Sequence, residues 1–384
     1  MTTIAVGFPP EPLPEPVLHP ARRNVTRDIF LMRDDESALS AYSRIESRRA
    51  TPCSQGRGTV LYCVLWARSS PQQAFQPTRK VVVVKKLMRS HIDHAVATGE
   101  TQEHPYNEIA IMQQLGDDVH VSTIHEALID EKYLYIIMPW LGHDLLTTVF
   151  HRPNIDMYQV ARALMTDLAH IQQSPSCMIH RDVSPENIIC TASSTGIGAC
   201  PLIDFAMALK CVELEGTPQH IAAGQPWCGK HPYTSPEALA QLELDFGADV
   251  WSMGVVLLTL ALRERLWERL WVVPEDSGGS SHAMQPHVDL MYSFFILRKG
   301  LADHDLLDRT IESLLALHRS GSSHEEQPAC LRKMCNVQSM DPLLRDLLAW
   351  MLTPNRADRP SVSEIMTHSW WSSRVDDAAE GGPW

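Results

Sequence analysis

The sequence predicts an α+β protein, with strands concentrated in its first third and helices in the remainder. Residues 59–66 and 81–84 are β-branched and aromatic runs of the kind found in strands. Later segments, at 108–115, 156–173 and 341–352, have the apolar spacing of helices. Periodicity alone therefore indicates a mixed protein of strands and helices, and the motifs between these elements narrow the fold class.

Composition excludes several classes of partner. The chain has 384 residues, 44% of them hydrophobic, and a formal net charge of −13, which argues against binding to nucleic acid or to anionic membranes. Its 9 cysteines form no CxxC pair, as expected of a reduced protein in the cytoplasm or otherwise inside the cell. The most apolar run, residues 255–273, is interrupted by charged side chains and cannot span a bilayer. We expect neither a nucleic-acid nor a membrane partner.

Residues 1–40 are rich in proline. Prolines stand at positions 9, 10, 12, 14, 16 and 20, so we expect an extended, flexible tail without regular helix or strand. The alternative is a Pro-rich ligand that docks onto a partner protein.

A polar loop between two apolar pairs carries the first chemical signal. The pairs are residues 178–179 and 188–189, and Pro185 prevents regular strand pairing between them. The loop presents Asp182, which could accept a hydroxyl proton, and Asn187, whose side-chain oxygen could ligate Mg²⁺. Asp204 follows a second apolar pair further along the chain. An acceptor, an amide oxygen and a carboxylate are the groups that phosphoryl transfer needs to align a hydroxyl with a Mg²⁺-bound triphosphate.

These residues carry a family resemblance. His180-Arg181-Asp182 through Asn187 resembles the catalytic loop of the eukaryotic protein kinases, and Asp204-Phe205-Ala206 resembles their metal-binding motif with its Gly replaced. Further matches follow in the family's order: Ser235-Pro236-Glu237, which resembles the end of the activation segment, and Arg359, which in the family pairs with that glutamate. The resemblance implies a two-lobed fold, with a small β-rich N-lobe that has one helix, a larger helical C-lobe, and ATP between them.

The resemblance also implies a division of the chain. We expect a tail at residues 1–40, the N-lobe and hinge at 41–141, and the C-lobe at 142–371. Insertions between 264 and 340 make the C-lobe longer than the family needs, and residues 372–384 form a C-terminal tail.

Two glycines resemble part of the phosphate-covering loop of the family. Gly56 and Gly58 match the first two glycines of G-x-G-x-x-G, while Leu61 stands where the third belongs and Cys63 where the following valine does. The alternative is a plain Gly-rich hairpin turn.

Other residues match the family's nucleotide site. Lys85 matches the third-strand lysine that reaches the α- and β-phosphates, and Glu108 matches the helix residue that orients it through an ion pair. Met138 matches the residue guarding the back of the pocket. In the hinge that follows, Pro139 keeps the carbonyl that adenine needs, and Leu141 supplies an N–H.

The function that follows is ATP-dependent phosphorylation of a protein hydroxyl. The resemblance implies that Asp182 accepts the hydroxyl proton, that Asn187 and Asp204 hold Mg²⁺, and that Arg181 links the catalytic loop to the activation segment. The segment Ser184-Pro185-Glu186-Asn187 is more similar to the K-P-E-N form of serine/threonine kinases than to the A-A-R-N form of tyrosine kinases.

Two departures from the family occur at positions that touch each other in its fold. Ser184 replaces a lysine that contacts the γ-phosphate, and Lys230 replaces a threonine that bonds both that lysine and the catalytic aspartate. We expect the ammonium group to have moved from one position to the other, which makes Lys230 a catalytic residue. The alternative is that Lys230 points into solvent and that the enzyme is weak or inactive.

Two other function classes remain. A pseudokinase that acts as a nucleotide-binding scaffold is favoured by the incomplete glycine loop and by Ala206, and opposed by the full set of catalytic residues. A small-molecule phosphotransferase of the aminoglycoside kind would lack the Pro-Glu end of the activation segment, which Pro236 and Glu237 supply.

Overall fold

A computed structural model describes residues 10–23, 26–45, 51–53, 58–98, 104–116, 123–151, 156–173, 176–193, 196–197, 199–214, 217–218, 220–226, 228–230, 233–262 and 337–372. Of the insertions expected between 264 and 340, residues 264–336 lie outside these ranges, as do all but the first residue of the expected C-terminal tail. Among the helices within the ranges, none combines the length and the apolar character that crossing a bilayer requires.

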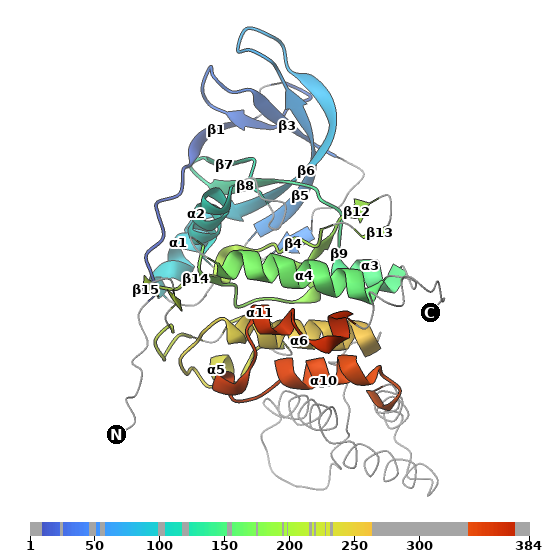
Figure 1. Cartoon of the computed structure of the whole chain (residues 1–384). Helices are drawn as coiled ribbons and strands as arrows, with labels where there is room; N and C mark the ends of the chain where they lie inside the picture. The colour runs from blue at the N-terminus through green and yellow to red at the C-terminus, as the bar shows by residue number, and fades with distance from the viewer. Residues whose placement is uncertain are drawn as a thin grey trace, which may run out of the picture.

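The N-lobe is built on an eight-stranded sheet (Figure 1). Its order is β3-β2-β1-β7-β8-β6-β5-β4, and a further pairing of β3 with β5 closes the sheet on itself. The strands are β1 (His19–Arg23), β2 (Leu31–Arg33), β3 (Ser40–Arg44), β4 (Thr51–Cys53), β5 (Gly58–Ala67), β6 (Gln76–Met88), β7 (Glu126–Ile129) and β8 (Tyr133–Pro139).

Strand β6 shows how alternation sets the two faces of this sheet. Val82 and Val84 are fully buried in the apolar cluster on one face, while Val83 and Lys85 turn to the other face and line a cleft. One face of β6 therefore packs in the apolar interior of the N-lobe, and the other face forms part of the cleft wall.

The expectation that residues 1–40 hold no regular strand is wrong, because β1 and β2 join the sheet. β1 pairs in parallel with β7 and antiparallel with β2. Pro20 has no N–H to donate, but its carbonyl accepts the N–H of Asp34 at 2.8 Å, so the strand accommodates this proline. Leu31 and Met32 bury their side chains and hold β2 in place. Residues 1–9 are outside the described ranges, and a docking role for them stays a prediction.

The described part of the N-lobe contains two helices rather than the one expected, α1 (Arg89–Thr98) and α2 (Pro105–Leu115). The sequence pattern misses α1 because this helix buries only Ile92 and Ala95, too few residues for a clear apolar stripe. In α2, Pro105 occupies the first turn, where its missing N–H costs no hydrogen bond, and Gly116 ends the helix at φ +67°.

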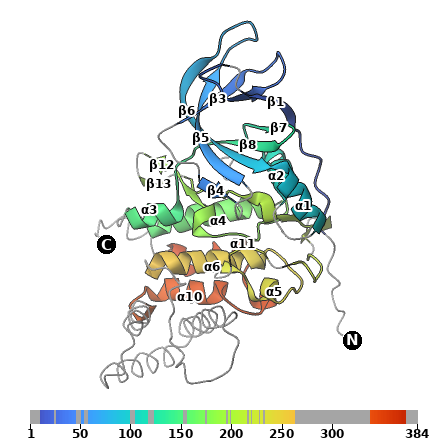
Figure 2. The same ribbon diagram turned by 180° about the vertical axis from the view of Figure 1, so that it is seen from behind.

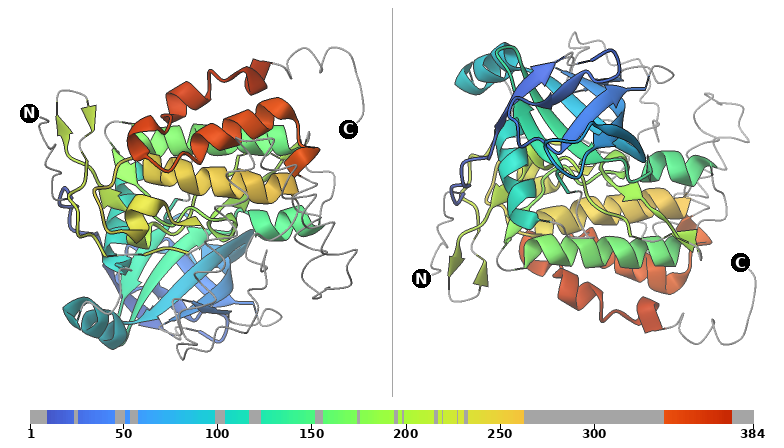
Figure 3. Two further views of the ribbon diagram at one scale, coloured as in Figure 1. Left: turned by 90° about the horizontal axis from the view of Figure 1, so that it is seen from below. Right: turned by 90° about the horizontal axis from the view of Figure 1, so that it is seen from above.

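The C-lobe is mainly helical. Within the described residues, its helices are α3 (Leu145–His151), α4 (Met157–Gln172), α5 (Pro236–Leu239), α6 (Gly247–Leu262), α10 (Pro342–Met351) and α11 (Val362–Ile365). Seen from below, α4, α6 and α10 lie side by side in layers (Figure 3). The expected helices at 156–173 and 341–352 are confirmed as α4 and α10. Helix α6 is apolar and buried on nearly every side and forms the centre of this lobe.

Short strand pairs brace the connections between the C-lobe helices. The pairs are β9 (His143–Asp144) with β11 (Ile189–Cys190), β10 (Met178–Ile179) with β14 (Leu209–Lys210), β12 (Ala192–Ser193) with β13 (Gly196–Ile197), and β15 (Glu213–Leu214) with β16 (Thr217–Pro218). Because β10 and β11 lie on either side of the polar loop at 180–188, both ends of that loop are fixed, as the sequence predicts.

An ion pair at the base of the C-lobe joins the end of the activation segment to a distant part of the chain. Arg359 Nη1 lies 2.6 Å from Glu237 Oε1, and Nη2 lies 3.0 Å from Oε2. The arginine side chain is fully buried and the glutamate nearly so. The pairing expected between these two residues is therefore confirmed, and its bidentate geometry is the strong form of an Arg–carboxylate contact.

Candidate active site

A cleft of about 310 Å³ lies between the two lobes. Strands β5, β6 and β8 supply one wall, and β9, β11 and the segment before Asp204 supply the other. Six of the residues expected to bind nucleotide or metal line it: Lys85, Glu108, Met138, Pro139, Leu141 and Asp204. The cleft is large enough for a nucleotide-sized ligand.

The sequence pattern misses the apolar lining of this cleft. Val60, Tyr62 and Val83 line it from the N-lobe, and Ile189 and Ile203 line it from the C-lobe. Alternation in β5 provides a usable signal, because Val60 pairs directly with Lys85 in the register of β5 and β6. Apolar side chains on both walls can pack against the two faces of a planar aromatic ring.

The expected alignment of the glycine loop is wrong. Cys63 is fully buried in the apolar cluster of the sheet, so it does not cover the cleft as the family's valine would. Val60 is the valine that faces the cleft. Gly58 starts β5 opposite Leu87 and is not part of the cleft lining, whereas Gly56 lies outside the described residues. The pattern placed on Gly56 and Gly58 puts the family's valine at Cys63, three residues after the valine that faces the cleft.

Lys85 joins three separate parts of the chain. Its Nζ lies 2.9 Å from both carboxylate oxygens of Glu108, on α2, and 3.0 Å from Oδ1 of Asp204. The lysine and Glu108 are buried, while about a third of the Asp204 side chain remains exposed to the cleft. A sheet strand, a helix and the segment after the catalytic loop thus meet at one ammonium group.

The oppositely charged groups of this cluster stabilise one another in their ionised forms. Burial by itself would lower the pKa of Lys85, but Asp204 and Glu108 outweigh it and raise that pKa well above its usual range. Burial would likewise raise the pKa of Asp204, yet Lys85 holds it below the usual value. Both groups are therefore charged at neutral pH.

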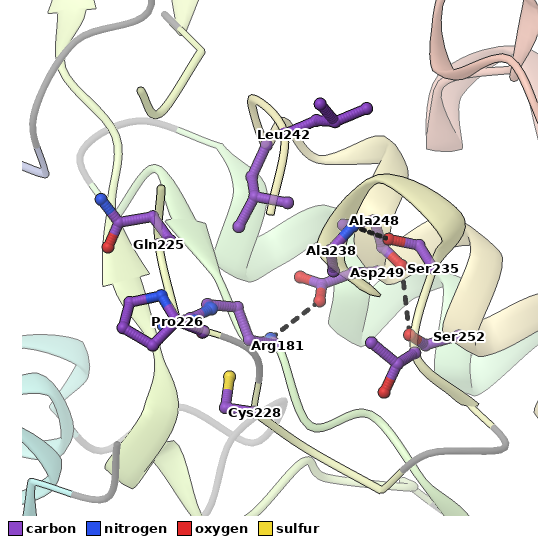
Figure 4. A pocket seen from close by; sticks show the side chains of 12 residues that line it. Arg181, Gln225, Pro226, Cys228, Ser235, Ala238, Leu242, Ala248, Asp249 and Ser252 are labelled. Carbon is purple, nitrogen blue, oxygen red and sulfur yellow. Dashed lines mark hydrogen bonds between the residues drawn. The ribbon is translucent and has the colours of Figure 1, made fainter. Parts of the chain in front are cut away.

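Hydrogen bonds to Asp249 anchor the catalytic loop to helix α6. Asp249 accepts the backbone N–H of His180 at 2.7 Å and that of Arg181 at 3.0 Å, the second of which appears in Figure 4. Arg181 adopts φ +68°, a left-handed conformation that costs a non-glycine residue about 1–3 kcal/mol. The buried carboxylate of Asp249 compensates for this strain, although burial raises its pKa. The ring of Phe205 packs against that of His180, with centroids 4.8 Å apart.

The side chain of Arg181 contacts the activation segment at two points, one near its start and one in its second half. Its Nη1 donates to the carbonyl of Met207 at 3.4 Å, and its Nη2 donates to the carbonyl of Pro226 at 2.7 Å. Figure 4 shows Arg181 beside Pro226 and Cys228 in a small pocket above helix α6. The guanidinium therefore satisfies two backbone carbonyls of the segment.

Asp182 sits at the centre of a second polar cluster. Its Oδ1 accepts the backbone N–H of Lys230 at 3.0 Å, and its Oδ2 lies 3.2 Å from the Lys230 Nζ. The same Nζ lies 3.0 Å from the Ser184 Oγ. Asn187 donates from its Nδ2 to the Asp182 Oδ2 at 2.6 Å. The structure thus brings Lys230 to both Asp182 and Ser184, with 38% of its side chain still exposed.

The oxygen atoms of Asn187 and Asp204 suit Mg²⁺. The Asn187 amide nitrogen is engaged by Asp182, which leaves its side-chain oxygen as the atom available to a metal. Asp204 is ionised and partly exposed to the cleft. One or two protein oxygens, completed by phosphate and water, are what Mg²⁺ commonly takes in phosphate-binding sites.

Comparisons with known proteins agree with this geometry. The family profile of the protein kinase domain matches residues 69–371. The cGMP-dependent protein kinase egl-4 of Caenorhabditis elegans is 29% identical over 190 residues, which is 48% of this chain and 22% of that protein. Ribosomal protein S6 kinase alpha-4 of Mus musculus is 28% identical over 160 residues, 41% of this chain and 20% of that protein. The cGMP-dependent protein kinase 2 of Mus musculus is 28% identical over 221 residues, 55% and 24% respectively.

The chain belongs to the protein kinase domain family, because the family profile covers well over half of its length. The fold is accordingly the two-lobed kinase fold of mixed strands and helices. The matches span only about a fifth to a quarter of the length of these relatives.

Gly229 gives a sharp test of the second cluster. It adopts φ +82°, and a Cβ there would lie 2.5 Å from the carbonyl oxygen of Arg181 and 3.3 Å from Asp182 Oδ1. We expect Gly229→Ala to lower the melting temperature by several degrees and to displace Asp182, with a matching loss of any phosphoryl transfer.

Gly224→Ala is the matched control, because Gly224 has a similar φ of +88° but no atom within 4 Å of its Cβ position. The control should show only the cost of positive φ, about 1 kcal/mol. Thermal unfolding of both variants measures the difference, and equal destabilisation would contradict the close approach at Gly229.

Proposed function

We propose that this chain is an ATP-dependent protein kinase that transfers the γ-phosphate to serine or threonine hydroxyls. The observation that carries the proposal is the buried Lys85 ammonium, which is held between Glu108 and Asp204 at the edge of the cleft. An ammonium fixed in this way presents positive charge where the α- and β-phosphates of a nucleotide would lie.

The cleft walls would hold the base of ATP. Val60 and Val83, from the N-lobe wall, and Ile189, from the C-lobe wall, would pack against the ring. The hinge contributes the carbonyl of Pro139 and the N–H of Leu141, which match the donor and acceptor edge of adenine. Met138 closes the back of the cleft.

Mg²⁺, held by Asn187 and Asp204, would neutralise charge on the phosphate oxygens. The Lys85 ammonium balances the charge of Asp204 and keeps that carboxylate ionised and oriented. The Asn187 amide hydrogen bond to Asp182 sets the spacing between the metal ligands and the catalytic carboxylate.

Asp182 would orient the substrate hydroxyl and accept its proton as the new oxygen–phosphorus bond forms. Lys230 Nζ, 3.2 Å from Asp182, would supply the positive charge that other family members place two residues after the catalytic aspartate. The Ser184 Oγ, 3.0 Å from the Lys230 Nζ, would hold that ammonium in position. The preference for serine and threonine over tyrosine is supported by Ser184-Pro185-Glu186-Asn187.

A nucleotide-binding scaffold without transfer activity is the second candidate. The observation that favours it is that the expected glycine-loop alignment fails: Gly58 does not line the cleft, and Cys63 is buried in the sheet. The other matched glycine, Gly56, lies outside the described residues.

Phosphate transfer by the full chain distinguishes the two functions. We expect incorporation of phosphate from MgATP into serine- and threonine-containing members of a peptide array. Asp182→Asn should reduce the rate at least about 10²-fold, because it removes the proton acceptor, while MgATP binding measured by calorimetry is retained. If the wild-type chain binds MgATP but transfers no faster than Asp182→Asn, the scaffold function is the correct one.

The role of Lys230 has its own test. Lys230→Thr should lower kcat about 10²-fold, the scale of one electrostatic contact to a developing charge. Lys230→Thr combined with Ser184→Lys should recover much of that loss, since the ammonium returns to the position it has in other family members.

The exposed Lys132, in the turn between β7 and β8, provides the control. Lys132→Thr removes the same charge without touching Asp182 and should leave kcat unchanged. Full activity of Lys230→Thr, or a double variant no better than the single one, would show that the exchange has not occurred.

A further inference from the structure

The N-terminal segment at residues 10–23, which we call the strap, runs along one side of the molecule from the C-lobe to the N-lobe sheet. Figures 1 and 2 show it passing helices α1 and α2 on its way to β1. It contacts three parts of the chain that the proposed catalysis depends on: the start of the activation segment, helix α2 and the edge of β7.

The lower end of the strap is tied to the activation segment. The Glu11 N–H donates to the carbonyl of Lys210 at 2.8 Å, and the Glu11 carboxylate lies 2.8 Å from the Lys210 Nζ. Lys210 belongs to β14, whose partner residue Met178 leads into the catalytic loop. Leu13 packs against the apolar core of the C-lobe.

The middle of the strap is tied to helix α2 by a reciprocal pair of hydrogen bonds. The Val17 N–H donates to the Gln113 side-chain oxygen at 2.8 Å, and the Gln113 side-chain nitrogen donates to the Val17 carbonyl at 2.9 Å. The glutamine amide thus satisfies both polar groups of one strap residue, as a neighbouring strand would. Leu18, the next residue, packs against the cluster that contains Ile109 of the same helix.

The upper end of the strap is anchored in the sheet. His19 and Pro20 pair in parallel with Leu128 and Ile129 of β7, and β1 pairs on its other side with β2. Because strands β1 and β2 complete the closed sheet, the strap cannot slide along the helix without breaking that closure.

Helix α2 is therefore held near both of its ends. At its start, the N–H of His104 donates to the carbonyl of Ala206, just after Asp204, at 2.8 Å. Near its end, Gln113 binds the strap. Glu108, the partner of Lys85, lies between these two attachments.

We propose that the strap is a positioning element, in which Glu11 and Val17 fix helix α2 relative to the activation segment and so hold Glu108 on Lys85. This inference rests on the proposed kinase function for its effect on catalysis, but not for its effect on the helix.

Gln113→Ala tests the middle contact, with Gln114→Ala as the matched control. Gln114 is the next residue of the same helix and is exposed, so its replacement has the same helix propensity effect without touching the strap. For Gln113→Ala we expect faster hydrogen exchange of the amides of residues 105–115 and about a tenfold lower kcat/KM for ATP. Gln114→Ala should match the wild type in both.

A charge exchange tests the lower contact. Glu11→Lys and Lys210→Glu each place like charges together and should each speed amide exchange in α2 and reduce kcat/KM about fivefold. The double variant restores an ion pair of reversed sign and should recover most of both losses, which a merely destabilising pair of substitutions would not do.

The amide hydrogen-exchange measurement distinguishes the strap proposal from the kinase proposal, because it needs no phosphate transfer. A chain that transfers no phosphate, but whose α2 amides respond to Gln113→Ala and not to Gln114→Ala, would overturn the kinase proposal and support the strap. Identical exchange in the two glutamine variants, or a double charge variant that recovers nothing, would overturn the strap.

Discussion

The buried ammonium group of Lys85 is the constraint on which the rest of the site depends. A lysine that is removed from water must be paired with more than one acceptor, and here Glu108 and Asp204 provide three oxygens within 3.0 Å. Those carboxylates come from α2 and from the segment after the catalytic loop. Satisfying one charge therefore requires the sheet, the helix and the C-lobe to meet, and this meeting creates the cleft.

Among the residues that the structure describes, two of the four non-glycine residues with positive φ lie in the polar motifs of the site. Arg181 and Asp204, one in each of the two chemical motifs, both adopt positive φ, at +68° and +65°. Such conformations persist only where neighbours over-determine them, as Asp249 does for Arg181 and Lys85 does for Asp204. Helix α6, which carries Asp249, is the most completely buried helix of the C-lobe and gives the catalytic loop a rigid support. The packed core of the C-lobe thereby holds the polar groups of the catalytic loop in fixed positions.

The sequence is sufficient to predict the residues whose identity is set by chemistry. The resemblance to the protein kinases predicts Lys85 and Glu108, because in that family a strand lysine and a helix glutamate precede the residues matched by Asp182, Asn187 and Asp204. Features set by register or by distant pairing were not found. The glycine pattern predicts that Cys63 covers the cleft. The register of β5 on β6, in which Val60 pairs with Lys85, decides instead which side chains face it. Prolines argued against strands in residues 1–40, yet β1 is held by partners far along the chain, including β7, that local propensity does not reveal.

We expect the Lys85 ammonium, oriented by two carboxylates, to bind the phosphates of ATP. The most direct measurement is the affinity for MgATP of Lys85→Met and Lys86→Met, determined by titration calorimetry on the full chain. Lys86 is the next residue of β6 and turns to the opposite face, where its Nζ lies 4.0 Å from the centroid of the Tyr133 ring. Lys85→Met should bind MgATP at least about tenfold more weakly than the wild type, and Lys86→Met should bind it equally well, because only the first ammonium faces the cleft. Equal affinity of the two variants would contradict this role of Lys85.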